Sequence, residues 1–168
     1  ILLIASLAGP GIILKAVQQD APAESYAYSE VFFDTYDEVR KHHEELFTRL
    51  GAESYSHAID EADGLYIDSF YLPAAEDATN LIVLTTGVHG IEGYIGSVML
   101  DVFFTEIYPQ LDTDDTGVLT IANVNPYGMK YMRRYNENNV DLNRNFILDW
   151  DSFDLSVNEK YPQVDSFL

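Results

Sequence analysis

The first regular alternation of hydrophobic and polar residues along the chain has the period of a helix. An apolar stripe at helical spacing runs through residues 35–50, and it consists of Val39, His43, Leu46, Phe47 and Leu50. Thr35 and Glu38 stand three residues apart, as in a capping box, and Gly51 follows where such a helix would end. The pattern therefore predicts a helix over 35–50.

Three short segments further along the chain have the composition of β-strands, and they are residues 65–72, 81–86 and 118–123. The run LIVLTT at 81–86 is typical of a strand that is buried on both faces. A turn at 87–90 and a helix over 92–107 would connect it to the third strand, and a turn at 125–128 would follow. We expect the apolar face of this second helix to consist of Ile91, Ile95, Val98 and Phe103. The order strand, helix, strand predicts an α/β fold with a mainly parallel sheet, in which the loops after the strands carry the chemistry.

The two ends of the chain have a different character. Residues 1–17 read ILLIASLAGPGIILKAV, which fits the hydrophobic part of a signal peptide or a membrane anchor. A buried N-terminal helix or strand is the alternative. The composition of residues 18–34 predicts a linker. Because the chain starts at Ile1 and stops without a terminating element, we expect 35–168 to be the N-terminal part of a longer domain in an exported or membrane-anchored protein.

Composition narrows the choice of partners. The net charge of −19 argues against binding to nucleic acid, because so acidic a surface repels phosphate. Four of the nine basic residues nevertheless fall between Lys130 and Arg144, where they either bind a carboxylate ligand or balance the acidic residues around them. The chain has no cysteine, so a transition metal would be held by histidine and carboxylate.

The first chemical motif is His89 with Glu92, three residues later, in a glycine-flanked turn between a strand and a helix. This spacing aims an imidazole and a carboxylate at one point, which is two-thirds of a zinc site of the two-histidine, one-carboxylate kind. The alternative is a helix-start glutamate beside an incidental histidine. His42 and His43 point in different directions on their helix, and we interpret them as structural or surface residues.

The second motif is Asp141-Leu142-Asn143-Arg144-Asn145-Phe146. An arginine binds a carboxylate with two parallel hydrogen bonds, and an adjacent asparagine amide can add another. Asn143 and Arg144 therefore indicate a receptor for a substrate carboxylate. The alternative is a structural Arg144 paired with Asp141.

These motifs in this order, HGIE after an apolar strand, then NPYG, then RR, then DLNRNF, resemble the zinc carboxypeptidase superfamily, which includes the aspartoacylase and succinylglutamate desuccinylase group. From about Tyr36 to Phe146 the chain looks most like a bacterial branch that is defined as a domain of unknown function. The resemblance implies an α/β three-layer sandwich with a mainly parallel mixed sheet, of the carboxypeptidase and phosphorylase type, incomplete at its C-terminus.

The resemblance also implies roles at the metal. His89 and Glu92 match the first two ligands of one Zn²⁺ ion. Asp141 matches a residue that orients the first zinc histidine from its far ring nitrogen, which fixes the tautomer. The third ligand, a histidine, and the general base, a glutamate, would lie outside this chain, because no histidine follows Phe146.

The remaining roles concern the substrate. Asn143 and Arg144 match the pair that holds a terminal carboxylate, and one of Arg133 and Arg134 matches the arginine that polarises the scissile carbonyl, with Arg133 slightly favoured. The sequence thus predicts a zinc metallocarboxypeptidase acting on peptides. A deacylase of N-acyl amino acids and a non-catalytic carboxylate-binding module are the alternatives, and the isolated fragment would be inactive.

Overall fold

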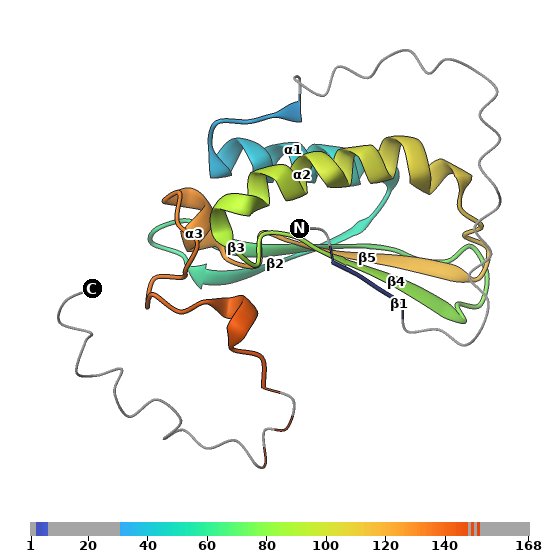
Figure 1. Cartoon of the computed structure of the whole chain (residues 1–168). Helices are drawn as coiled ribbons and strands as arrows, with labels where there is room; N and C mark the ends of the chain where they lie inside the picture. Colours follow the sequence, from blue (N-terminus) through green and yellow to red (C-terminus); the bar gives the residue numbers. More distant parts are fainter. Residues whose placement is uncertain (1–2, 7–30, 148, 150, 152–168) are drawn as a thin grey trace.

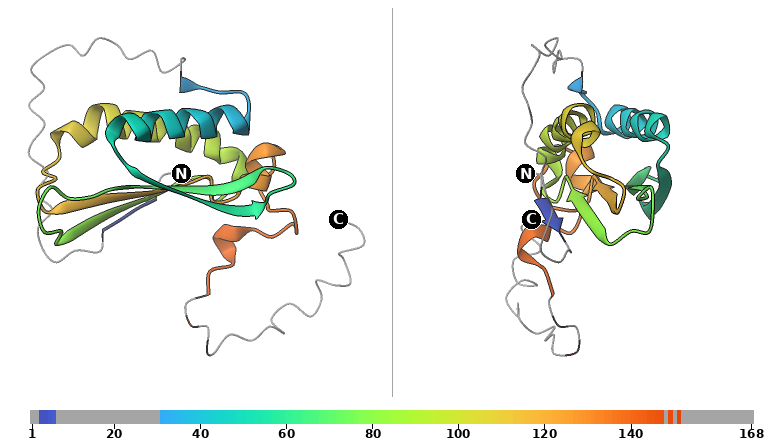
Figure 2. Two further views of the ribbon diagram at one scale, coloured as in Figure 1. Left: turned by 180° about the vertical axis from the view of Figure 1, so that it is seen from behind. Right: turned by 90° about the vertical axis from the view of Figure 1, so that its right-hand side faces the viewer.

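The computed structural model describes residues 3–6, 31–147, 149 and 151 and shows helices packed on one face of a sheet (Figure 1). The sheet has five strands in the order β1-β4-β5-β3-β2. Helices α1 and α2 lie next to each other across it (Figures 1 and 2). The elements that form these two layers are β1 (Leu3–Ser6), α1 (Tyr36–Leu50), β2 (Glu53–Asp60), β3 (Leu65–Leu72), β4 (Asn80–Thr85), α2 (Gly93–Val102) and β5 (Thr116–Ala122).

The α/β class and the mixed sheet agree with the prediction, but the described sheet is less parallel than expected. Only β4 and β5 pair in parallel, and the pairs β1–β4, β3–β5 and β2–β3 are antiparallel. Parallel neighbours need a long crossover, which α2 and the segments after it provide between β4 and β5, whereas the short turn between β2 and β3 makes a hairpin. A third layer on the opposite face of the sheet remains a prediction.

Helix α1 forms as its sequence pattern predicts. Thr35 and Glu38 make the reciprocal capping box, and Gly51 ends the helix in the left-handed conformation, with φ 76°. The buried face of α1 consists of Tyr36, Val39, His43, Leu46 and Phe47. Phe47 stacks on Phe70 of β3 with ring centroids 4.1 Å apart, and this aromatic pair lies in the main core.

The predicted second helix is present, but half of its predicted apolar face is exposed. It consists of η2 (Gly90–Glu92), α2, the π-helical segment η3 (Phe103–Ile107) and the short η4 (Tyr108–Gln110). Val98 and Phe103 are buried, whereas Ile91 and Ile95 are 45% and 52% exposed. Small residues face the sheet instead: a Cβ on Gly96 would lie 2.8 Å from the Cβ of Thr86, so only a glycine allows this close approach.

Polar contacts between the two helices explain the adjacent histidines of α1. His43 is fully buried, with Nε2 2.8 Å from the Ser97 hydroxyl, and His42 lies 2.8 Å from the buried Asp101 carboxylate. Burial, together with the neighbouring His42, lowers the pKa of His43 to about 3, so this ring is neutral. Both histidines are structural, as interpreted from the sequence.

Strand β2 was not predicted from the sequence, and most of the N-terminal segment lies outside the described residues. Strand β2 escaped prediction because it is an edge strand whose side chains, apart from Ala58, are exposed, so it shows no hydrophobic alternation. Residues 3–6 pair with β4 as β1. The other residues of the predicted signal or anchor segment and residues 18–30 of the predicted linker lie outside the described part. Within that part, no helix is long and apolar enough to cross a membrane.

Candidate functional site

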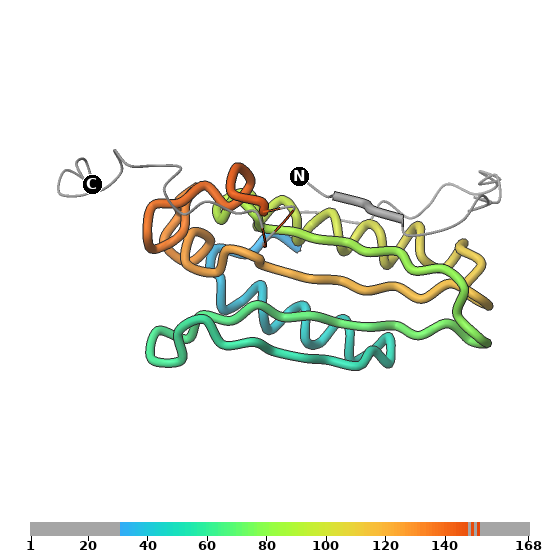
Figure 3. The backbone as a smooth tube through the Cα atoms, turned by 90° about the horizontal axis from the view of Figure 1, so that it is seen from below, coloured from blue at the N-terminus to red at the C-terminus, as the bar shows by residue number. Residues whose placement is uncertain are grey.

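The loops that follow β4 and β5 leave the same end of the sheet (Figure 3). The two strands are parallel neighbours with Thr85 opposite Ile121, so their carboxyl ends coincide. The pairing continues into the loops, where Val124 N–H donates to Thr86 O at 3.0 Å and Asn125 N–H donates to Gly87 O at 2.8 Å. Both sequence motifs lie in or after these loops, at the edge where α/β proteins place their chemistry.

Close backbone contacts bring the two loops together. A Cβ on Gly90 would lie 2.1 Å from the carbonyl carbon of Gly128, so η2 can rest on α3 (Pro126–Lys130) only because residue 90 is glycine. Asn125 caps α3 by accepting from Gly128 N–H at 2.9 Å, and its amide donates to Arg134 O at 3.2 Å. The turn predicted at 125–128 is thus the beginning of a short helix.

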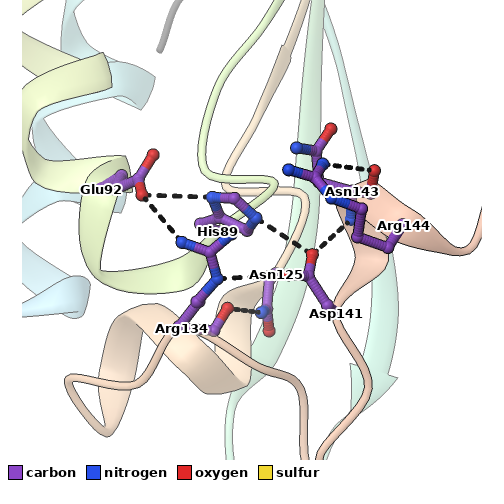
Figure 4. A network of polar contacts seen from close by, with 7 residues as sticks. All are labelled: His89, Glu92, Asn125, Arg134, Asp141, Asn143 and Arg144. Carbon is purple, nitrogen blue, oxygen red and sulfur yellow. Dashed lines mark hydrogen bonds and ion pairs between the residues drawn. The ribbon is translucent and has the colours of Figure 1, made fainter.

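The His89 ring lies between two carboxylates (Figure 4). Its Nδ1 is 3.1 Å from Glu92 Oε1, and its Nε2 is 3.0 Å from Asp141 Oδ1. A ring with a single N–H can donate to only one of them, so both contacts are satisfied either by a proton on each ring nitrogen or by a cation between Nδ1 and the Glu92 oxygen. Two ligands of a tetrahedral zinc ion are about 3.3 Å apart, which is close to the observed separation.

Asp141 connects three parts of the site. Besides the His89 ring, it accepts from Arg134 Nε at 3.2 Å and from the backbone N–H of Asn143 at 3.0 Å. Although partial burial raises the pKa of the Asp141 carboxyl, the hydrogen bonds from His89 and Arg134 outweigh this effect and hold the pKa below its ordinary value. The carboxylate is therefore charged, and the contact with the far ring nitrogen that the sequence predicted is present.

The structure separates the two adjacent arginines. Arg134 reaches the site, because it donates to Asp141 and its NH1 lies 3.9 Å from Glu92 Oε1. Arg133 points elsewhere, with NH2 3.4 Å from Asn139 Oδ1 and its guanidinium 6.0 Å from the Tyr127 ring centroid. The slight preference for Arg133 is therefore not supported. Consecutive side chains diverge here because the backbone between them is held by η2, whose amides donate to both carbonyls.

Asn143 and Arg144 lie beside the histidine in η5 (Leu142–Arg144), where Asp141 is the N-cap (Figure 4). Arg144 is exposed and donates to Asn143 O at 3.1 Å. It forms no ion pair with any described carboxylate, and the arginine on Asp141 is Arg134. The alternative of an Arg144–Asp141 pair is therefore wrong. The guanidinium of Arg144 can bind a ligand.

A cavity of about 620 Å³ opens beside the histidine. The polar part of its lining consists of Thr85, His89, Glu92 and Asn143, and the apolar part includes Val88, Ile121, Val124, Leu142 and Phe146. The sequence analysis did not assign these apolar residues to the site, because in a sequence they cannot be told from core positions. A second cavity, of about 370 Å³ between α1 and β2, contains Arg40, which already forms hydrogen bonds to Asp68 at 2.6 and 2.9 Å.

Residues 32–168 match the model of a family described as "Protein of unknown function (DUF2817)". The chain belongs to this family. The match agrees with the resemblance to a branch of unknown function, and it leaves the wider relationship to zinc carboxypeptidases as a proposal. Neither the curated proteins nor the solved structures contain a match to this DUF2817 chain.

In the described part of this DUF2817 chain, few histidine and carboxylate side chains come together in the way that a metal site requires. No group of three or more histidine, cysteine, aspartate or glutamate residues there could hold a metal ion. His42 and His43 form hydrogen bonds between α1 and α2. His57 lies on β2, the edge strand that is separated from β4 by β5 and β3. The facing atoms of His89 and Glu92, the pair that the sequence analysis assigned to a metal, lie 3.1 Å apart.

Proposed function

We propose that this protein is a zinc-dependent hydrolase that cleaves an amide bond next to a free carboxylate, acting as a metallocarboxypeptidase. One observation carries the proposal: His89 Nδ1 and Glu92 Oε1 converge to 3.1 Å while the opposite ring nitrogen contacts Asp141 at 3.0 Å. A carboxylate on the far ring nitrogen is the usual support of a zinc-binding histidine.

The donor atoms suit zinc. His89 and Glu92 would hold the ion, and a third ligand would come from outside the described residues. When bound, zinc supplies hydroxide at neutral pH and Lewis-acid activation of a carbonyl. With the proton on Nε2, His89 would donate a hydrogen bond to Asp141, and its Nδ1 lone pair would be directed toward Glu92 and the metal position.

Arg134 is the residue that we assign to the scissile carbonyl. Its guanidinium has a hydrogen bond to Asp141 through Nε, and this contact restrains the side chain while NH1 extends toward Glu92. A positioned guanidinium beside the metal ligands can donate to the substrate oxygen as negative charge develops on it. Restraint of the donor in advance lowers the reorganisation that the reaction would otherwise require.

Asn143 and Arg144 are assigned to the substrate carboxylate. Arg144 uses one N–H for Asn143 O, which leaves further N–H groups for a bidentate contact, and Asn143 borders the cavity. We expect Arg144→Ala in the full-length protein to raise KM for substrates with a free carboxylate about 10- to 150-fold, since a hydrogen bond to a charged group contributes ~1.5–3 kcal/mol. An unchanged KM would contradict the assignment.

The decisive experiment combines metal analysis with activity. The full-length protein is assayed for release of the C-terminal residue from peptides and for hydrolysis of N-acyl amino acids, and its zinc content is measured. Glu92→Gln should lose both zinc and activity. Glu45→Gln, on the exposed side of α1, is the matched control and should keep both.

The alternatives give different results in the same experiment. Cleavage of N-acyl amino acids alone would replace the peptidase by a deacylase, which needs the same residues. A non-catalytic carboxylate-binding module is the other alternative. It would bind acyl amino acids without zinc and without cleavage, and that result would refute the hydrolase.

A further inference from the structure

Strand β2 forms one edge of the sheet, and within the described part of the chain it pairs only with β3 (Figure 3). Its outer side therefore presents backbone N–H and C=O groups that no described residue pairs with. Proteins usually protect such an edge with lysine, proline or a bulge. The sequence of β2 contains neither lysine nor proline, and its one irregularity, between Ala58 and Asp60, lies at its end. Residues 53–58 can thus pair with a further strand.

A cavity of about 370 Å³ lies along this edge, between β2 and α1. Ser54 and Ser56 border it from β2, and the Ser56 hydroxyl accepts from Arg40 NH2 of α1 at 3.3 Å. Side chains alternate between the two faces of a sheet, so every second residue of an added strand would lie on this same face. The edge therefore offers room for a side chain as well as partners for a backbone.

The two basic residues in the lining of the cavity already have acidic partners. Arg40 donates to the Asp68 carboxylate at 2.6 and 2.9 Å, and this contact raises the pKa of the guanidinium. Lys41 Nζ lies 3.9 Å from Glu45 Oε1. The positive charges beside β2 are therefore compensated within α1 and β3.

The remaining charges of the cavity are negative. Asp37 and Glu44 belong to its lining, and neither forms a hydrogen bond or ion pair with any described residue. A basic side chain fits such a surroundings by charge. A second copy of this chain does not, because antiparallel pairing of two β2 strands about their midpoint would place Glu53 opposite Asp60 at both ends, and like charges directly opposite are destabilising.

We propose that the edge of β2 binds an extended, basic segment of a partner protein, which adds to the sheet as a further strand and places a lysine or arginine side chain over the cavity. Hydrogen bonds between the main chains supply affinity, and the basic side chain beside Asp37 and Glu44 supplies selectivity. The proposal does not depend on the proposed hydrolase, because β3 and β5 separate this edge from β4 and the metal pair.

Titration of the full-length protein with short peptides tests the proposal. The probe is an acetylated and amidated octapeptide of alternating lysine and valine, which has no free carboxylate for Asn143 and Arg144. We expect it to bind at least about 10-fold more tightly than the corresponding glutamate–valine peptide, because only the basic peptide complements the charge of the edge. N-methylation of its fourth and fifth residues keeps the charge, removes a backbone donor on each side and should weaken binding about 10-fold. Equal binding of either comparison peptide would overturn the proposal.

Hydrogen exchange shows where the peptide binds. In the free full-length protein, amides within 53–60 that do not bond to β3 should exchange rapidly, and the lysine–valine peptide should slow them. Protection confined to another part of the chain would refute the assignment to β2. Amides of β2 that are all protected before the peptide is added would also refute it, since the edge would then be occupied by the chain itself or by a second copy.

Variants separate this site from general attraction to an acidic protein. The double variant Asp37→Asn/Glu44→Gln should weaken binding of the lysine–valine peptide about 3- to 10-fold, as the loss of two exposed ion pairs does. Glu76→Gln/Asp77→Asn is the matched control, because it removes the same charge from the exposed loop between β3 and β4, outside the cavity lining, and it should bind the peptide unchanged. Equal weakening in the two double variants would refute the site. Glu92→Gln should also leave binding unchanged, and its loss there would place the peptide at the metal pair instead.

Discussion

Replacement of Asp141 by asparagine is the most direct test of how the site is organised. The carboxylate accepts from the His89 ring at 3.0 Å, from Arg134 Nε at 3.2 Å and from Asn143 N–H at 3.0 Å. Asparagine has nearly the same size but only one acceptor oxygen and no charge. Its NH₂ group cannot accept from a second donor, so at least one of the two side-chain contacts must be lost or weakened.

The expected magnitude follows from the contact to the histidine. Loss of a carboxylate that orients a zinc-binding imidazole typically lowers metal affinity 10- to 100-fold. We therefore expect Asp141→Asn in the full-length protein to weaken zinc binding within that range, and to lower kcat/KM further because Arg134 loses its charged anchor. Competition with a chromogenic zinc chelator measures the affinity, and single-substrate kinetics measure the second effect.

A matched variant controls for the loss of any surface carboxylate. Asp63 also contacts a cation, Lys130 Nζ, at 2.9 Å, but it lies outside the lining of the cavity. Asp63→Asn should therefore leave zinc affinity unchanged. The reasoning is refuted if Asp141→Asn binds zinc as tightly as the unmodified protein, or if the two variants lose affinity equally.

Three further predictions address the arginines, the helix interface and the loop contact. Arg134→Ala should lower kcat/KM about 100- to 1000-fold, as loss of an oxyanion donor does, whereas Arg133→Ala should change it about 2-fold, and equal losses would contradict the assignment. His43 has a pKa of about 3 when folded against 6.5 ordinarily, so the unfolded chain binds a proton that the folded chain excludes. The free energy of unfolding should therefore fall as the pH drops below about 6.5, and urea denaturation of His43→Met should show a shallower fall. Gly90→Ala should reduce stability by ~1–3 kcal/mol because its Cβ would overlap Gly128, and an unchanged thermal midpoint would contradict that contact.

Local patterns in the sequence were sufficient for most of the regular elements. The capping box at Thr35, the left-handed Gly51 and the strand over Leu65–Leu72 depend on residues a few positions apart, and all three are found as predicted. The predictions failed where the result depended on which side of a helix packs against a distant part of the chain. Ile91 and Ile95 have helical spacing, but the sheet contacts the glycine side of α2, and no local pattern indicates which side a neighbouring sheet will cover.

At the candidate site, too, some features follow from the local sequence and others only from the tertiary structure. The sequence alone determined that His89 and Glu92 converge, because their three-residue spacing spans one short helical turn after a strand. Residue spacing gave no sign that Asp141 contacts the ring from 52 residues away, a contact that only the family resemblance implied, and the tertiary structure alone directed Arg134 rather than Arg133 toward Asp141. It also turned strand-end residues such as Val124 into the wall of a cavity. These contacts depend on the parallel pairing of β4 with β5, a long-range arrangement that residue spacing does not encode.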